Sequence, residues 1–372
     1  MPLSRLATYR PRRAAAWFAA VLCMLGGMDS VVAQKSSGGS SKPTATGTVS
    51  TSPAGRSQPA ITFATLALAV AQQDYTVEQI RRFPDAKGGI VSVRERVKVD
   101  ADGSKAPPFE LTFLGVEGEL SGSATYTKWQ QTYARYGDLF HKHGSFSVRD
   151  LLGIQQNYTL HEFGPVVRAG RPAVRTVVFP QTADKSIWVV DFDAVTLVPL
   201  CWTEFDSQFR LLAEVEAVNF VASIASAAVL PPPAAGTVQH AAFADAKTFL
   251  GDPPGVVEPP PVLASYGVSA IETRDDPLNG QQKLVVTYTD GVDDFLVVQV
   301  PGTADVFANL VPTDKGGRVA TTGHTIARFR DSSMRVLLFW DDGVAFQVTG
   351  RGSLSRLDSV AKQLYLQALS TN

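Results

Sequence analysis

One segment in the middle of the chain alternates between apolar and polar residues, and this pattern constrains the fold more than any other feature. The segment runs from Arg171 to Phe220. A period of two is typical of half-buried β-strands, and the polar breaks at Gln181–Lys185, Asp193–Ala194 and Asp206–Gln208 are typical of tight turns. The segment therefore predicts a meander of three or four antiparallel strands, one face of which is rich in aromatic residues and must be covered by another element.

Further strands and helices are predicted ahead of this meander. Residues Gly89–Val99 and Phe109–Gly115 also alternate, and we expect them to pair as a hairpin that extends the same sheet. Residues Thr125–Phe140 place aromatic side chains at steps of three and four, which is the spacing of one helix face. We expect this helix to cover the aromatic face of the sheet. Shorter helices are predicted at Thr76–Phe83 and Ser147–Leu152.

The C-terminal part of the chain predicts a second, smaller antiparallel sheet with one helix. Alternating segments flank the turn signals Asp290-Gly291, within Gln282–Val300, and Asp341–Gly343, within Val336–Val348, so each predicts a hairpin. Residues Ser353–Leu369 carry an apolar helical face and are expected to close the chain as a helix. The predicted fold class is therefore α+β.

Composition divides the chain into five parts. Residues 1–33 are predicted to be a signal peptide, because a basic start is followed by an apolar core, Ala14–Gly27, that is too short to span a bilayer. A membrane anchor is the alternative interpretation. Residues 34–60 are rich in Ser, Gly, Thr and Pro and are expected to form a flexible tether. The remaining parts are an N-terminal domain over 61–228, a Pro-rich linker over 229–262 and a C-terminal domain over 263–372.

Catalytic and metal-binding motifs are not found in the sequence. The net charge is -1 and basic residues do not cluster, so we expect no nucleic-acid partner. His141 and His143 could hold a metal, but no ligand cluster accompanies them, which favours a solvated helix C-terminus. Asp191 and Asp193 could bind a metal or share a proton, but turn formation is favoured. We therefore expect no metal, no cofactor and no enzymatic activity.

Aromatic residues of the central sheet and of the predicted helix are the remaining candidate for a binding surface. A sheet that is partly covered by a helix can leave an apolar cavity for an acyl chain or an apolar peptide segment, although a filled core is an equal alternative. The candidate ligand-binding residues are Trp129, Tyr133, Phe179, Trp188, Val190, Phe192, Trp202 and Phe209.

Two stretches of the chain resemble the MucB/RseB family of extracytoplasmic sigma-factor regulatory proteins. The first, Gly170–Phe220, has a G-R-P-A entry at Gly170–Ala173 and a strand that ends in D-x-x-T-x-x-P-L at Asp193–Leu200. The second, Lys283–Val300, is similar to the family's C-terminal strand pair with its Y-S-D-G-L sequence. The end of the chain, Val348–Val360, resembles the family's ending, in which a strand leads into a helix.

The resemblance implies an N-terminal domain like the periplasmic lipoprotein carriers, which is an incomplete, strongly curved antiparallel barrel closed by helices. It also implies a periplasmic, non-enzymatic regulator of envelope stress signalling that binds a membrane-anchored anti-sigma factor, together with a lipid or lipoprotein. Three alternatives stay open at this point: a carrier of lipid or lipoprotein without a signalling role, an envelope adaptor with filled cores, and a hydrolase that uses Asp191 or Asp193.

Overall fold

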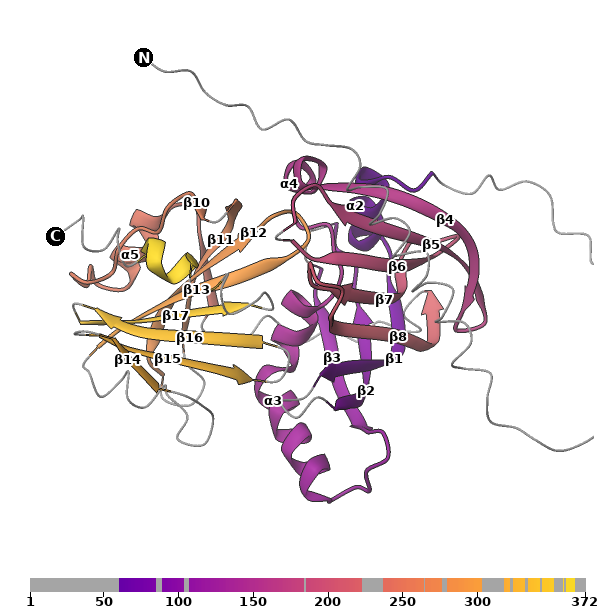
Figure 1. Cartoon of the computed structure of the whole chain (residues 1–372), viewed down its shortest axis with the longest axis horizontal. Coiled ribbons are helices and arrows are strands. Elements are labelled where there is room, and N and C mark those ends of the chain that lie inside the picture. The colour runs from indigo at the N-terminus through magenta and orange to yellow at the C-terminus, as the bar shows by residue number, and fades with distance from the viewer. Residues whose placement is uncertain are drawn as a thin grey trace, which may run out of the picture. The chain divides into compact units, whose positions relative to one another are not determined.

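The structure is a computed structural model, and Figure 1 shows its helices and strands. Residues 1–59 lie outside the described part of the chain, and they include the predicted signal peptide and nearly all of the predicted tether. None of the helices within the described part is long and apolar enough to cross a membrane. The described residues are 60–84, 89–103, 107–183, 185–222, 237–263, 265–275, 280–302, 318–321, 324–331, 334–341, 343–350, 357 and 359–364.

The first sheet is antiparallel throughout and contains eight strands: β1 (Tyr75–Pro84), β2 (Ile90–Val99), β3 (Phe109–Val116), β4 (Tyr158–Arg168), β5 (Arg171–Pro180), β6 (Ile187–Asp193), β7 (Pro199–Phe205) and β8 (Leu211–Ala222). Their order is β3-β2-β1-β8-β7-β6-β5-β4, and the edge strands β3 and β4 do not pair with each other. The sheet is therefore not closed into a barrel. The predicted meander corresponds to β5–β8, and the predicted hairpin corresponds to β2 and β3.

The segment predicted as a helix at Thr76–Phe83 is a strand, β1, so this prediction is wrong. Alternate residues of β1 are buried, as in any strand with one interior face. Two of these interior residues are the polar Gln79 and Arg81, which hide the alternation when the sequence is read by hydropathy. Pairing with β2 and β8 on both sides then fixes the strand, because tertiary pairing overrides local propensity.

Three helices accompany this sheet: α2 (Phe63–Gln72), α3 (Ala124–Gly144) and α4 (Leu151–Asn157). Helix α4 begins later than the predicted Ser147–Leu152, because the side chain of Asp150 accepts a hydrogen bond from the backbone of Gly153 and caps the helix there.

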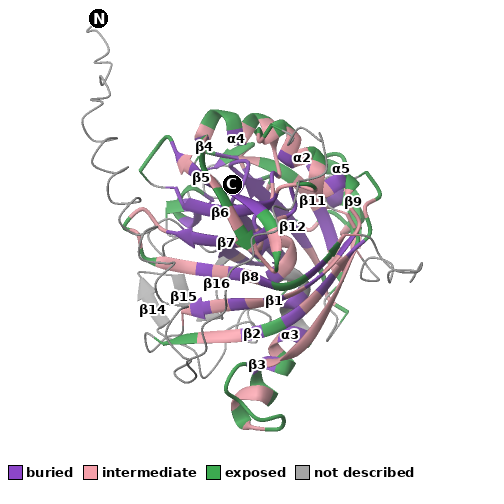
Figure 2. Cartoon of the chain, turned by 90° about the vertical axis from the view of Figure 1, so that its right-hand side faces the viewer, coloured by how far each residue is buried: buried purple, intermediate pink, exposed green. Residues whose placement is uncertain are grey.

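Contrary to the prediction, α3 does not cover the aromatic face of the meander. Its side chains Trp129 and Tyr133 pack with Phe83 and Val93 at the β1–β3 end of the sheet, and the rings of Phe83 and Trp129 stack with centroids 5.3 Å apart. The short connection between β3 and α3 explains this position, because consecutive elements are usually neighbours in space. The meander face is covered instead by α2, α4 and residues 146–148. Figure 2 shows how deeply β6 and β7 are buried.

The second sheet is also antiparallel, with more but mostly shorter strands. Its order is β10-β11-β12-β13-β17-β16-β15-β14, with β9 paired to β11. Its hairpins β12–β13 and β16–β17 are the two that the sequence predicts. Residues 357 and 359–364 are helical, and four apolar side chains of this segment lie in the core of the sheet. The strands are β9 (Thr237–His240), β10 (Val262–Leu263), β11 (Tyr266–Asp275), β12 (Gln282–Thr289), β13 (Asp294–Pro301), β14 (Arg318–Thr321), β15 (His324–Asp331), β16 (Met334–Asp341) and β17 (Val344–Gly350).

Part of the stretch predicted as a linker, residues 229–262, has regular structure. Strand β9 pairs with β11, and helix α5 (Phe243–Phe249) packs against the core of the second sheet. Residues 229–236 lie outside the described part of the chain. The domain boundaries drawn from the sequence stay predictions.

A buried ion pair between Arg81 on β1 and Glu95 on β2 lies inside the first sheet. Arg81 and Glu95 are 1% and 0% exposed, and the nearest charged atoms are 2.9 Å apart. The Glu95 carboxylate also accepts hydrogen bonds from Gln79, at 2.5 Å, and from the hydroxyl of Tyr133 on α3, at 2.7 Å. The Arg81 guanidinium lies over the ring of Trp202, 5.6 Å from its centroid. This cluster therefore joins β1, β2, α3 and the meander.

Removal of the Glu95 carboxylate is expected to destabilise the protein strongly, because it leaves the buried charge of Arg81 without its partner. We expect Glu95→Ala to lower the free energy of unfolding by about 3–5 kcal/mol. Glu78→Ala is the matched control, because Glu78 forms a partly exposed pair with Arg96 and its loss should cost about 1 kcal/mol or less. Urea unfolding followed by circular dichroism measures both. Equal losses in the two variants would contradict the assigned role of the buried pair.

Candidate functional site

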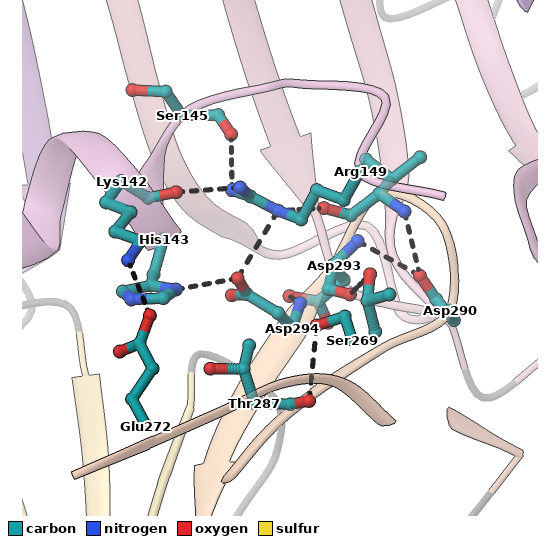
Figure 3. A network of polar contacts seen from close by, with 12 residues as sticks. Lys142, His143, Ser145, Arg149, Ser269, Glu272, Thr287, Asp290, Asp293 and Asp294 are labelled. Atoms are coloured by element: carbon teal, nitrogen blue, oxygen red, sulfur yellow. Dashed lines mark hydrogen bonds and ion pairs between the residues drawn. The ribbon is translucent and has the colours of Figure 1, made fainter. Parts of the chain in front are cut away.

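The turn between β12 and β13 enters the apolar core on one face of the first sheet. We call residues Asp290–Asp294 the inserted turn. Its Val292 is 0% exposed and belongs to the same apolar cluster as Trp188 and Phe192 of the meander. One side chain of the second sheet thus completes the core of the first. Figure 3 shows the polar contacts that surround this insertion.

Gly291 allows a close approach between the inserted turn and α4. Its φ of 112° lies in the region that favours glycine, and its carbonyl oxygen accepts hydrogen bonds from the backbone N–H groups of Arg149, at 2.8 Å, and Asp150, at 3.4 Å. A Cβ atom at this position would overlap the backbone of Ile154 in α4. The insertion therefore requires a residue without a side chain here.

Arg149 holds the inserted turn against the C-terminal end of α3. Its Nε donates to the carbonyl oxygen of Val292 at 2.9 Å and lies 3.3 Å from a carboxylate oxygen of Asp294. Its two terminal nitrogens donate to the carbonyl oxygens of Lys142, at 2.7 Å, and Ser145, at 3.0 Å. Carbonyl groups at a helix C-terminus lack partners within the helix and attract positive charge, so Arg149 caps α3 and binds the turn with one side chain (Figure 3).

Asp290 is bound by side chains from the first sheet and from α4. One of its carboxylate oxygens accepts hydrogen bonds from the Tyr158 hydroxyl, at 2.8 Å, and from Nζ of Lys185, at 3.1 Å. The Asn157 amide donates to the backbone oxygen of Asp290 at 3.0 Å. Lys185 is 1% exposed, and its Nζ also lies 4.6 Å from the ring centroid of Tyr266. A buried lysine of this kind needs such partners, because charge is costly to remove from water.

The end of α3 makes two further polar contacts with the second sheet. Nδ1 of His143 lies 2.7 Å from a carboxylate oxygen of Asp294, and Nζ of Lys142 lies 3.4 Å from the carboxylate of Glu272. Burial lowers the pKa of His143, although Asp294 favours the protonated ring. Burial tends to raise the pKa of Glu272, but Arg274 and Lys142 outweigh it and hold this pKa below its usual value.

The prediction that His143 lies at a solvated helix end is therefore wrong. His143 is 2% exposed because the C-terminus of α3 packs against β13, a contact that sequence periodicity cannot reveal. Across the described part of the chain, no group of three or more His, Cys, Asp or Glu residues could hold a metal ion.

Asp193 forms the turn that the sequence predicts. It accepts hydrogen bonds from the backbone N–H groups of Val195 and Thr196 and pairs with Arg171 at 2.6 Å. Burial tends to raise its pKa, but these hydrogen bonds hold the pKa below its usual value. Asp191 lies within β6 instead and is bound by Arg175 at 2.8 Å.

The candidate ligand-binding residues do not share one surface. Phe209 precedes β8 in a tight turn with a φ of 59°, so its predicted place on a strand is wrong. The Asp206 side chain stabilises that turn by accepting the backbone N–H groups of Gln208 and Arg210. Trp188, Val190, Phe192 and Trp202 are buried on the meander face. Trp129 and Tyr133 are buried where α3 packs on β1–β3, and Phe179 is half-buried on β5.

Sequence reasoning missed most residues of the inserted-turn site. Asp290-Gly291 was visible as a hairpin turn, but nothing in the sequence indicated that this turn leaves its own sheet. Arg149 and Lys185 lie in polar connections, where charged residues are common and carry little information. The one unusual signal in the sequence was the number of acidic residues at this turn, since three of the five residues of Asp290–Asp294 are aspartates.

Comparisons with known proteins return similarities among solved structures but not among family models or curated proteins. No protein-family model matches the sequence, and no curated protein matches it. Among solved structures, a crystal structure of MucB is similar over 81% of this chain and 94% of that chain, with 16% identity and a TM-score of 0.44. The complex of Pseudomonas aeruginosa MucA and MucB is similar over 80% of this chain and 95% of that chain, with 18% identity and a TM-score of 0.42.

A putative outer membrane lipoprotein-sorting protein domain from Vibrio parahaemolyticus is also similar. The similarity covers 45% of this chain and 93% of the lipoprotein-sorting domain, with 10% identity and a TM-score of 0.19.

Replacement of Gly291 is expected to displace the inserted turn. Both Gly291 and Gly343 have a positive φ, so Gly→Ala at either position costs about 1 kcal/mol of backbone strain. Only Gly291→Ala also forces a Cβ into the backbone of Ile154, so we expect it to cost about 3 kcal/mol or more. Hydrogen–deuterium exchange at the amides of Arg149 and Asp150 should rise in Gly291→Ala and stay unchanged in Gly343→Ala. Unchanged exchange in both variants would contradict the insertion.

Stability is expected to fall with acid because of the two histidines at the end of α3. Burial, reinforced by Arg81 and Arg149, lowers the pKa of His141 from its usual 6.5 to about 3, and burial lowers the pKa of His143. The unfolded chain therefore binds a proton at each histidine more readily than the folded chain does. The contribution of these two histidines to folding stability is complete above the usual histidine pKa and is lost as the pH falls below it. Between about pH 7 and pH 5, His141 should account for about 1–2 kcal/mol of lost stability.

Urea unfolding of wild type and His141→Phe at several pH values measures this effect. The aromatic replacement keeps the contact with the ring of Phe109, whose centroid lies 4.4 Å from that of His141. The difference in stability between the two proteins should shift in favour of the variant as the pH falls. Parallel curves would show that His141 is not responsible.

Proposed function

We propose that this protein is an exported, non-enzymatic regulator of envelope stress signalling in the periplasm, where it binds a membrane-anchored, anti-sigma-factor-like partner. The observation that carries the proposal is the stretch Gly170–Phe220, which resembles the MucB/RseB family in the sequence of its motifs. In the fold, this stretch forms the meander β5–β8, and its D-x-x-T-x-x-P-L motif supplies the Asp193 turn.

A regulatory role also suits the contact between the two sheets. Val292 contributes the apolar part of the inserted turn, while the surrounding contacts are ion pairs and hydrogen bonds from Arg149, Lys185 and His143. Interfaces of this polar kind commonly permit relative motion of the parts they join. A partner or ligand that binds one arrangement of the sheets more tightly would shift the population toward it by the difference in binding free energy.

No catalytic step is assigned to the acidic residues. Asp290, Asp294 and Glu272 are each held by basic side chains of the protein. Such pairing occupies the carboxylate oxygens with contacts inside the protein, which suits a structural contact better than proton transfer.

The alternative is a carrier of lipid or lipoprotein without a signalling role. The observation in its favour is the aromatic meander face of Trp188, Phe192 and Trp202, which is covered in part by the short helices α2 and α4. These helices expose Leu68, at 56%, and Leu152, at 68%, on their outer sides. Displacement of the helices would open an apolar site to an acyl chain.

Native mass spectrometry of the chain, purified from an envelope extract without detergent, separates the two functions. The regulator predicts a complex whose added mass is that of a protein partner, and peptide sequencing should identify the periplasmic part of an anti-sigma factor encoded beside this chain. The carrier predicts an added mass that matches a lipid. A bare mass, together with no binding to that anti-sigma factor in size-exclusion chromatography, would contradict both functions and favour an adaptor with filled cores.

A further inference from the structure

Residues on the first-sheet side bind the inserted turn through its backbone as well as through its side chains. Arg149 donates to the carbonyl oxygens of Val292 and, through its own backbone N–H, of Gly291. Asn157 donates to the carbonyl oxygen of Asp290. Such contacts do not depend on the side chains of the turn, so they would be equally available to another chain segment of the same shape.

The side-chain requirements of this site are also defined. The Asp290 carboxylate is bound by Tyr158 and Lys185, so an acidic residue is needed first. No side chain fits at the next position, because Ile154 lies against Gly291. An apolar residue must follow, because Val292 lies in the meander core. The site is therefore specific for the sequence Asp-Gly-apolar.

Charge complementarity extends this specificity. Arg149 and Lys185 on the first-sheet side face Asp290 and Asp294 of the turn. Removing such charges from water costs much of what their attraction returns, and a purely apolar contact of the same size would hold the sheets together at least as well. The polar contact is better suited to selecting one sequence than to maximal stability.

We propose that Arg149, Asn157, Tyr158 and Lys185 form a recognition site for an acidic Asp-Gly-apolar turn of a partner protein, and that the inserted turn occupies this site within the chain as a competitor. The identity of the partner as an anti-sigma-factor-like protein rests on the proposed function, whereas the site itself does not. Exchange of one such turn for another replaces each contact by its equivalent, so the two turns compete for the same site.

A cyclic peptide with the sequence of residues 287–295 tests the site without any natural partner. Val292→Asp in the full chain should expel the inserted turn, because it places a charge in an apolar core. Fluorescence anisotropy should then show that the labelled peptide binds the variant roughly tenfold or more tightly than it binds wild type, in which the site is occupied. Addition of Arg149→Gln to Val292→Asp should abolish this binding, and a peptide that carries aspartate in place of its valine should bind neither protein.

Gly291→Ala provides a second, milder way to expel the turn and should give the same order of affinities. The proposal is overturned if a folded variant fails to bind the peptide, or if wild type and both variants bind it equally. Loss of the fold in both variants would show that the turn is an obligatory part of the core and would also overturn it. Because the peptide is the only ligand, failure to find an anti-sigma-factor partner would leave these results unaffected.

Discussion

Arg81 lies in the interior of the first sheet, where its guanidinium group joins elements that are distant in sequence. It pairs with Glu95 on β2, and it donates to the carbonyl oxygen of Gly144, at 3.2 Å, and to the hydroxyl of Ser145, at 3.1 Å, at the end of α3. A guanidinium group keeps its charge under all ordinary conditions, so its burial requires nearly complete pairing. This requirement fixes the position at which α3 ends. The residues that follow α3, above all Arg149, can then reach the second sheet.

The end of α3 is accordingly shared by two arginines with different tasks. Arg81 anchors the helix to the first sheet, while Arg149 caps its last carbonyl groups and binds the inserted turn. Both arginines bind Ser145, so substitution of either arginine is expected to change the hydrogen bonding of the other. The contact between the sheets is thus a physical continuation of the polar interior of the first sheet.

Local patterns predicted most of the strands and failed where polar residues are buried. The meander, the hairpin β2–β3 and the two C-terminal hairpins follow from alternation and turn residues, which act over a few positions. Strand β1 was missed because Gln79 and Arg81 face the interior, where their charge and hydrogen bonds are satisfied by Glu95. The partner that makes this burial possible lies on another strand. A reading based on hydropathy alone therefore assigns these residues to the surface.

The sequence by itself determined the antiparallel sheets, the aromatic helix and the Asp290-Gly291 turn, because alternation, helical spacing and turn chemistry are properties of neighbouring residues. Only the tertiary structure decided that α3 covers β1–β3 rather than the meander and that Val292 enters the core of the other sheet. It also decided that His143 is buried against Asp294. These outcomes depend on which surfaces meet, and the free energy of such contacts is set by residues far apart along the chain.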